Sequence, residues 1–181
     1  MSRLRAPTEP VRMPIEDERS MRVLVFGNSG SGKSTYSRAL AEWEGLAYLD
    51  LDSVVWEPDQ IAVQRSPEAI HQSLEQFLAQ HQRWVIEGCY RELVEAAAPR
   101  CTQLVLLNPG LDACLANNAR RPGEPHKYAS LERQHAMAAK LRAWVTDYYQ
   151  RVDRRSYQAH RLIFDAHAGA KIEHTTVLDL R

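Results

Sequence analysis

The stretch Gly27-Asn28-Ser29-Gly30-Ser31-Gly32-Lys33-Ser34-Thr35 fits the pattern G-x-x-x-x-G-K-[ST] and decides the predicted fold. In this pattern, backbone N–H groups surround phosphate groups, the lysine reaches the β- and γ-phosphate oxygens, and the following hydroxyl binds Mg²⁺. Lys33 and Ser34 occupy those two positions. The stretch therefore predicts a loop that binds nucleotide phosphates together with Mg²⁺.

The residues on both sides of this loop support the same interpretation. Residues 21–26 form a short apolar, β-branched run, which is typical of a buried parallel strand. Residues 35–43 predict a helix, whose N-terminus favours a bound anion. The predicted apolar face of this helix contains Tyr36, Ala39, Leu40 and Trp43.

The composition indicates one domain without a general affinity for nucleic acid. The 181 residues include 23 Lys+Arg and 23 Asp+Glu, so the formal net charge is zero. Cys89, Cys101 and Cys114 lack metal-ligand spacing and predict reduced thiols. No apolar run has the length of a membrane span, and no signal-type segment precedes residue 21. We therefore expect a soluble, cytoplasmic protein.

The chain divides into a predicted tail and a predicted folded domain. Residues 1–20 contain three prolines among charged residues and too little apolar surface to offset the entropy of ordering. We expect them to form a flexible N-terminal tail, with one folded domain over residues 21–181.

Strands and helices are predicted to alternate after the first helix. Further strands are expected at 46–52, 84–87, 103–108 and 175–180, with helices starting near 67, 91, 111, 131 and 156. The helix from residue 131 is expected to reach residue 152 and to bury Val152. This alternation predicts an α/β fold with a parallel sheet covered on both faces. In such sheets, ligands bind at the carboxyl ends of the strands.

Three carboxylates are predicted at these strand ends. Asp50 and Asp52 lie two residues apart on an expected extended chain, so both side chains should face the phosphates. One is a candidate Mg²⁺ ligand through water, and the other a candidate to orient an acceptor hydroxyl. Glu87 is a further candidate for Mg²⁺. The alternatives are a solvated Asp pair and an N-cap role for Glu87.

Several cations are candidates to bind an acceptor or the transferred group. Arg91 is a candidate clamp for an anionic group, with a surface arginine as the alternative. A Pro- and Gly-containing loop over 119–130 predicts a flap, on which Arg121 is the first candidate to approach the phosphoryl group. The other cations of this flap are Arg120, His126 and Lys127. Arg151, Arg154 and Arg155 are expected to share one helical face, which we interpret as solvated, with phosphate binding as the alternative.

These motifs resemble the P-loop kinase superfamily of nucleoside-monophosphate kinases and shikimate or gluconate kinases, in element order over residues 21–181. Asp50-Leu51-Asp52 resembles the D-x-D of shikimate kinases, in which one Asp serves Mg²⁺ and the other the acceptor hydroxyl. Glu87-Gly88-Cys89-Tyr90-Arg91 resembles the D-G-F-P-R of adenylate kinases, with Glu for Asp and Tyr for Pro. In that segment, the Asp supports the metal and the Arg holds the acceptor phosphate.

The resemblance extends to the flap and to the sheet. Arg120-Arg121-Pro122 resembles the arginine-bearing LID of these kinases, although the loop is short and has no cysteine zinc site. The resemblance implies a three-layer P-loop NTPase fold with sheet order 2-3-1-4-5. The chain is also similar to bacterial proteins variously labelled adenylate-kinase-like, shikimate-kinase-like or DNA-topology-modulation proteins.

Together, these residues predict a kinase that uses ATP and Mg²⁺ on a small-molecule hydroxyl or phosphate acceptor. Lys33 stabilises phosphate charge, Ser34 with Asp50 or Glu87 positions Mg²⁺, and Asp52, Arg91 and Arg121 act on the acceptor side. The alternative is a nucleotide-binding regulatory module or slow ATPase. A polynucleotide kinase is disfavoured by the zero net charge. We expect a monomer or homodimer with no nucleic-acid or membrane partner.

Overall fold

Five parallel strands form one sheet in the order β2-β3-β1-β4-β5, in a computed structural model that describes residues 20–58, 63–120 and 131–178. The strands are β1 (Arg22–Gly27), β2 (Ala47–Asp50), β3 (Trp84–Gly88), β4 (Gln103–Leu107) and β5 (Ala170–His174). The predicted fold class and strand order are confirmed. The proposed tail, residues 1–20, lies outside the described residues apart from Ser20, so its flexibility stays a prediction.

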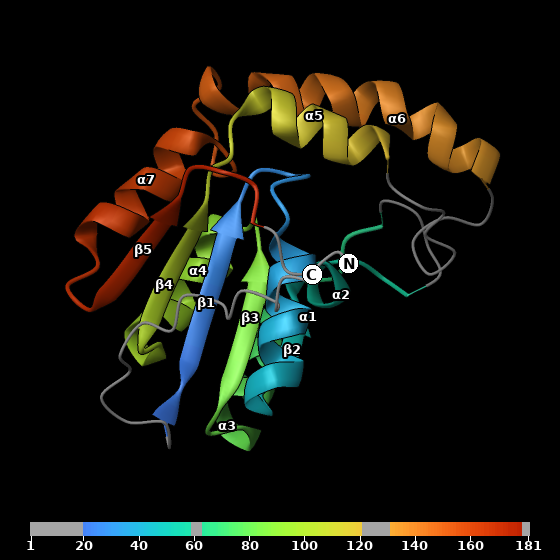
Figure 1. Ribbon diagram of the computed structural model, residues 1–181. Helices are drawn as coiled ribbons and strands as arrows, with labels where there is room; N and C mark the ends of the chain where they lie inside the picture. Colours follow the sequence, from blue (N-terminus) through green and yellow to red (C-terminus); the bar gives the residue numbers. More distant parts are fainter. Residues whose placement is uncertain (1–19, 59–62, 121–130, 179–181) are drawn as a thin grey trace, which may run out of the picture.

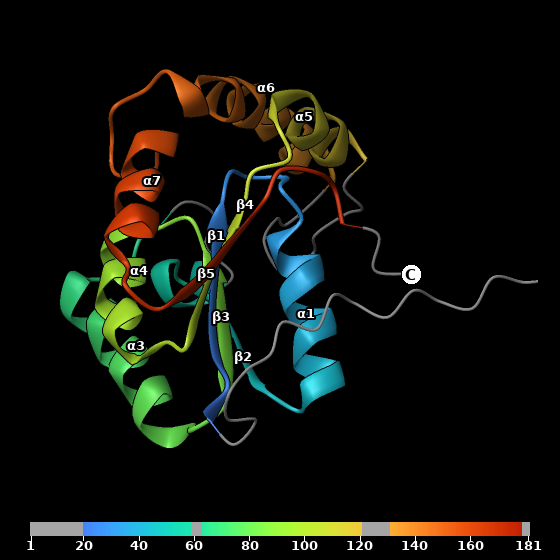
Figure 2. The same cartoon turned by 60° about the vertical axis from the view of Figure 1, so that its left-hand side comes forward.

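The helices complete three layers. They are α1 (Lys33–Glu44), α2 (Leu51–Val55), α3 (Pro67–Gln80), α4 (Arg91–Ala97), α5 (Leu111–Ala119), α6 (Leu131–Thr146) and α7 (Tyr157–Ala166), with short 3₁₀ turns η2 (Ala98–Arg100) and η3 (Asp147–Tyr149). Figure 2 shows α1 on one face of the sheet and α3, α4 and α7 on the other. Helices α5 and α6 cross the end of the sheet at which the strands finish (Figure 1).

The central strands are mostly apolar because both of their faces are buried. Val23 and Val25 of β1 belong to a core that lies under α1, together with Val85 of β3. Leu24 and Phe26 belong to the larger core on the opposite face. A strand with helices on both faces needs apolar side chains at most positions, which is why β1, β3 and β4 could be predicted closely from sequence.

The predicted strand over 46–52 is wrong at its carboxyl end. The strand finishes at Asp50, and α2 begins at Leu51. The Asp50 side chain caps this helix by accepting a hydrogen bond of 2.9 Å from the Asp52 backbone N–H. Leu51, Val54 and Val55 are buried, which is the spacing of a helix face. Asp50 and Asp52 therefore do not lie on one face of an extended chain.

The predicted last strand is displaced along the sequence. Residues 175–180 were expected, but β5 is Ala170–His174 and pairs with β4 from Gln103↔Ala170 to Leu107↔His174. This strand lies at the edge of the sheet, and none of its residues is buried. An edge strand needs few apolar side chains, so the apolar residues 177 and 178 misled the prediction.

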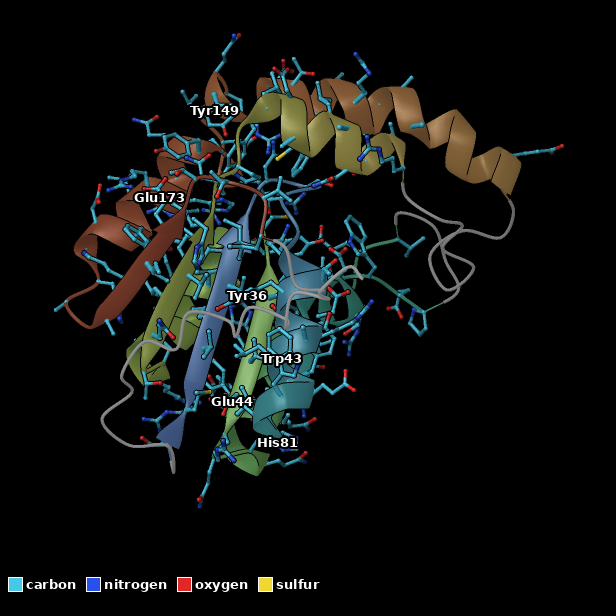
Figure 3. All side chains as sticks on the ribbon, viewed as in Figure 1. Tyr36, Trp43, Glu44, His81, Tyr149 and Glu173 are labelled. Carbon is cyan, nitrogen blue, oxygen red and sulfur yellow. The ribbon has the colours of Figure 1, made fainter. Side chains whose placement is uncertain are left out.

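Two predictions about buried helical faces are also wrong. Val152 is 84% exposed because α6 ends at Thr146, and the chain then turns through η3. Trp43, labelled in Figure 3, is 46% exposed. Ser37 is fully buried in α1, so the buried face of this helix is rotated away from Trp43. Within the described residues, no helix is long and apolar enough to cross a membrane.

Candidate active site

The loop after β1 has the conformation that its glycines permit. Gly30 has φ +78°, and a Cβ there would lie 2.3 Å from the backbone oxygen of Cys114. Gly32 has φ +96° and directly precedes α1. The Lys33 ammonium donates a hydrogen bond of 2.9 Å to the backbone oxygen of Asn28. The loop therefore closes around its own lysine at the N-terminus of α1, where the helix dipole favours phosphate.

Hydrogen bonds to the overlying helices hold this loop in place. The Asn28 amide, itself 1% exposed, donates to the Val145 backbone oxygen at 3.0 Å. The Asn117 amide of α5 donates to the Gly30 backbone oxygen at 2.9 Å. Sequence reasoning identified Asn28 as part of the loop but did not select Asn117, because an asparagine within a helix carries no pattern of its own.

Asp50 and Glu87 lie side by side on the α1 face of the sheet. They are register partners at the carboxyl ends of β2 and β3. Glu87 is 2% exposed and accepts a hydrogen bond of 3.0 Å from the Tyr48 hydroxyl. The alternative N-cap role of Glu87 is not found, since α4 begins at Arg91 and its N-cap residue is Tyr90.

The two carboxylates act on the same phenol. Burial raises the pKa of Tyr48 well above its usual value of 10, and the charges of Glu87 and Asp50 raise it further. Tyr48 therefore stays protonated and donates to Glu87 across the physiological pH range. Its hydrogen bond fixes one carboxylate oxygen of Glu87.

The residues on this side suit Mg²⁺. Ser34 lies in the first turn of α1, the helix that covers the face on which Asp50 and Glu87 lie. Among the described residues, no group of three or more His, Cys, Asp or Glu side chains is placed to hold a metal. Mg²⁺ usually binds through one or two carboxylates together with phosphates and water, so a hydroxyl and two carboxylates fit it.

Asp52 lies on the other side of the sheet from this pair. The Tyr90 hydroxyl donates to Asp52 Oδ1 at 2.6 Å, and the Trp56 indole N–H donates to the Tyr90 hydroxyl at 2.8 Å. Tyr90 and Leu51, which neighbours Asp52, belong to the core opposite α1. Asp50 and Asp52 were expected to face the same side, but they contact different parts of the protein.

Four charged residues, here called the cluster, lie along the segment that follows β3: Glu87 on the strand, Lys33 in the loop after the neighbouring strand β1, and Asp52 and Arg155 in contact with Tyr90. Burial raises the pKa of the Cys89 thiol to about 11, and smaller effects come from the charges of Lys33, Asp52, Arg155 and Glu87, in that order. The loop lysine, one metal-side carboxylate and the Asp52 carboxylate lie at the carboxyl ends of neighbouring strands. Ligands of parallel sheets bind at this edge.

Arg155 belongs to this cluster, although sequence reasoning placed it on a solvated helical face. Arg151, Arg154 and Arg155 lie in the loop between η3 and α7, so the shared helical face does not exist. The Arg155 guanidinium lies 4.7 Å from the centroid of the Tyr90 ring. The helix start at residue 156 was predicted, and Ser156 caps α7, which already placed Arg154 and Arg155 outside a helix.

The other predicted cations are not brought to this cluster within the described residues. Arg91 pairs with Glu95 of its own helix at 2.8 Å. Arg120 is exposed at the C-terminal end of α5. Arg121, His126 and Lys127 lie outside the described residues, so their predicted flap role stays a prediction.

A buried histidine supports the chain next to Cys89. His160 of α7 is fully buried, with Nδ1 2.8 Å from the Tyr148 hydroxyl and Nε2 3.0 Å from the Cys89 backbone oxygen. Burial lowers the pKa of His160 from 6.5 to about 4. The neutral ring therefore joins α7 to the segment that carries Cys89 and Tyr90.

This histidine predicts a loss of stability in acid. Its pKa is about 4 in the folded protein and near 6.5 when unfolded, so the unfolded chain takes up the proton first as the pH falls. The contribution of His160 to the free energy of unfolding should be fully present above about pH 6.5 and should decrease by up to roughly 3 kcal/mol towards pH 4. Urea unfolding at several pH values measures this change.

The variant His160→Gln isolates this contribution. Burial also lowers the pKa of His167 and of His174, so both act in the same direction as His160. Glutamine does not protonate in this range, so the variant should be less stable at pH 7 but should lose less free energy between pH 6.5 and 4. Parallel losses in the two proteins would contradict the assignment to His160.

Comparisons with known proteins find similarity to solved kinase structures. One is a sugar kinase from Janibacter sp. HTCC2649, with 18% identity, a TM-score of 0.46 and coverage of 90% of this chain and 86% of that chain. A gluconokinase from Sinorhizobium meliloti 1021 has 17% identity, a TM-score of 0.47 and the same two coverages. A shikimate kinase from Aquifex aeolicus has 17% identity, a TM-score of 0.46 and coverage of 84% of this chain and 86% of that chain. At this level, the likeness concerns the course of the chain and assigns no activity. No family model and no curated protein matches the sequence. The comparisons give the DNA-topology-modulation label no support.

Proposed function

We propose that this protein is a kinase that transfers the γ-phosphoryl group of ATP to a hydroxyl group of a small molecule, with Mg²⁺ as cofactor. The observation that carries this proposal is the shared place of the Lys33 loop after β1, Glu87 of β3 and the Asp52–Tyr90–Arg155 contacts, all at the carboxyl ends of these neighbouring strands. A nucleotide-binding loop alone would need only the first of these groups. Glu87 adds a candidate metal ligand, and Asp52 and Arg155 add a candidate acceptor site.

On the nucleotide side, the loop amides and Lys33 bind the phosphates. The lysine now donates to the Asn28 backbone oxygen and can exchange this contact for a phosphate oxygen of similar hydrogen-bonding character. Ser34, Asp50 and Glu87 would hold Mg²⁺, which would neutralise part of the phosphate charge when bound. The Tyr48 hydroxyl keeps Glu87 oriented towards this position.

On the acceptor side, Asp52 orients the attacking hydroxyl and accepts its proton. Phosphoryl transfer demands little covalent work from a protein, so its rate depends on positioning and on charge stabilisation. Arg155 provides a positive charge near Asp52 and is a candidate to bind the acceptor. We retain Arg121 as a candidate to approach the transferred phosphoryl group from the flap.

A hydroxyl acceptor suits this site better than a phosphate acceptor. Asp52 is a hydrogen-bonded carboxylate, which attracts a hydroxyl proton and repels a phosphate. Arg91, which was expected to bind an acceptor phosphate, instead pairs with Glu95. The proposal therefore assigns acceptor binding to Asp52 and Arg155, and it gives Arg91 no role in holding a phosphate.

A screen with ATP labelled in the γ-phosphate tests the proposal. Separate pools should contain sugars, hydroxy acids, aminoglycosides and nucleoside monophosphates, with product and inorganic phosphate quantified in each. We expect label in a product of a hydroxyl-bearing pool. Transfer to the phosphate of nucleoside monophosphates alone would contradict the hydroxyl assignment. Slow release of inorganic phosphate, with no labelled product in any pool, would favour a slow ATPase.

A further inference from the structure

A hydrogen-bonded chain of three side chains ends on the candidate acceptor carboxylate. Its first member is the Trp56 indole N–H, which donates to the Tyr90 hydroxyl at 2.8 Å. Its second is the Tyr90 hydroxyl, which donates to Asp52 Oδ1 at 2.6 Å. The chain links the end of α2 to the segment after β3, and neither Trp56 nor Tyr90 was selected from the sequence as a site residue.

The direction of both hydrogen bonds follows from the chemistry of the groups. An indole N–H only donates, so the Tyr90 oxygen must be the acceptor in the bond from Trp56. The phenol has a single proton, which is then directed to Asp52. A distance of 2.6 Å is typical of a hydroxyl bound to a carboxylate. Burial keeps the pKa of Tyr90 well above its usual value of 10, so this proton remains in place.

The ring of Tyr90 has a second contact, to Arg155. The guanidinium lies 4.7 Å from the ring centroid, a distance at which a cation is attracted to an aromatic face. Tyr90 itself is only 3% exposed, and the backbone oxygen of the preceding Cys89 is 3.0 Å from His160 Nε2. Tyr90 is therefore a rigid residue that touches both candidate acceptor groups.

We propose that Tyr90 is a positioning residue that orients Asp52 through its hydroxyl and Arg155 through its ring. This inference rests on the proposed function, because it concerns the same acceptor site. Tyr90 touches no reacting atom and acts through the two charged residues. Trp56 supports it by committing the tyrosine proton to Asp52.

A simpler explanation is that Tyr90 is a core residue whose hydroxyl found a nearby partner, as buried tyrosines usually do. The two explanations differ in what the hydroxyl contributes to the rate. A core residue affects stability but leaves the turnover of folded protein unchanged. A positioning residue affects kcat, and its effect requires the carboxylate that it orients.

The test compares Tyr90→Phe, Asp52→Asn and the double variant with the wild type in labelled γ-phosphate transfer. Tyr90→Phe keeps the ring contact to Arg155, so it should lower kcat by about 10- to 100-fold with little change in the acceptor KM. Binding of Mg·ATP, measured by calorimetry, should be unchanged. The double variant should be no slower than Asp52→Asn alone, since the hydroxyl then has no charge to orient.

Two further variants control for stability. Tyr157→Phe changes a half-buried tyrosine, whose ring centroid lies 5.2 Å from that of Tyr149, and it should leave kcat unchanged. Trp56→Phe keeps Tyr90 intact and should lower kcat by a smaller factor, about threefold to tenfold. This variant keeps the proposal testable if Tyr90→Phe does not fold.

The outcomes separate this inference from the proposed function. If the wild type transfers label and Tyr90→Phe does so at the same kcat, the positioning role is wrong and the kinase proposal stands. Multiplied effects in the double variant would also overturn it. If the wild type transfers label to no acceptor, the proposed function fails, and the positioning role fails with it.

Discussion

Replacement of Lys33 by alanine should lower ATP turnover by about 1,000-fold while leaving the fold intact. The ammonium is the positive side chain that the loop after β1 presents, and it now contacts the Asn28 backbone oxygen within that loop. In the transition state, charge accumulates on the β- and γ-phosphate oxygens, and fixed donors stabilise it. Steady-state turnover of purified protein measures the loss.

Lys171→Ala is the matched control for this variant. The Lys171 ammonium binds the backbone oxygens of Phe164, Asp165 and His167 at the end of α7, and Lys171 lies near the start of β5. The substitution should lower the melting temperature slightly and leave turnover unchanged. Undiminished turnover in Lys33→Ala, with a melting temperature like that of the wild type, would contradict the role of the loop.

The substitution Asp52→Asn should lower transfer to the acceptor by about 100- to 10,000-fold, the range typical of a lost general base. The amide oxygen can still accept the hydrogen bond from Tyr90, so the local fold should persist. Mg·ATP affinity should be unchanged, because the candidate metal ligands Asp50 and Glu87 lie on the other face of the sheet. Rates of labelled product formation and of nucleotide binding give the two values.

Asp165→Asn provides the comparison for Asp52→Asn. Asp165 is an exposed carboxylate that pairs with Arg161 four residues earlier on α7, so its loss removes a charge of the same kind far from the candidate site. Transfer by this control should equal that of the wild type. If Asp52→Asn also transferred at the wild-type rate, Asp52 would not act on the acceptor, and the proposed division between the two aspartates would be wrong.

The sheet could be predicted because each central strand is recognisable from its own short stretch of sequence. Strands β1, β3 and β4 are buried on both faces, so each contains an apolar run of at least three residues. Strand β5 lies at an edge and lacks such a run, which displaced its prediction by several residues. The strand order followed from the resemblance, since periodicity alone does not specify which strands are neighbours.

The nucleotide side could be predicted better than the acceptor side for a similar reason. The phosphate loop is one continuous motif, whereas Asp52, Tyr90 and Arg155 come from three separate segments. The helical spacing of Leu51, Val54 and Val55 was present in the sequence, yet the predicted strand was extended to Asp52. Only the folded chain places Arg155 over Tyr90, because that contact spans more than sixty residues.

The central claim is that the γ-phosphoryl group goes to an acceptor hydroxyl rather than to water. The most direct measurement is the partition of label between phosphorylated product and inorganic phosphate, for the wild type and for Asp52→Asn, with Mg·ATP and the hydroxyl-bearing pools. We predict that the wild type places most of the label in a product and that Asp52→Asn loses this product. Label found only in inorganic phosphate, at equal rates in both proteins, would contradict the account.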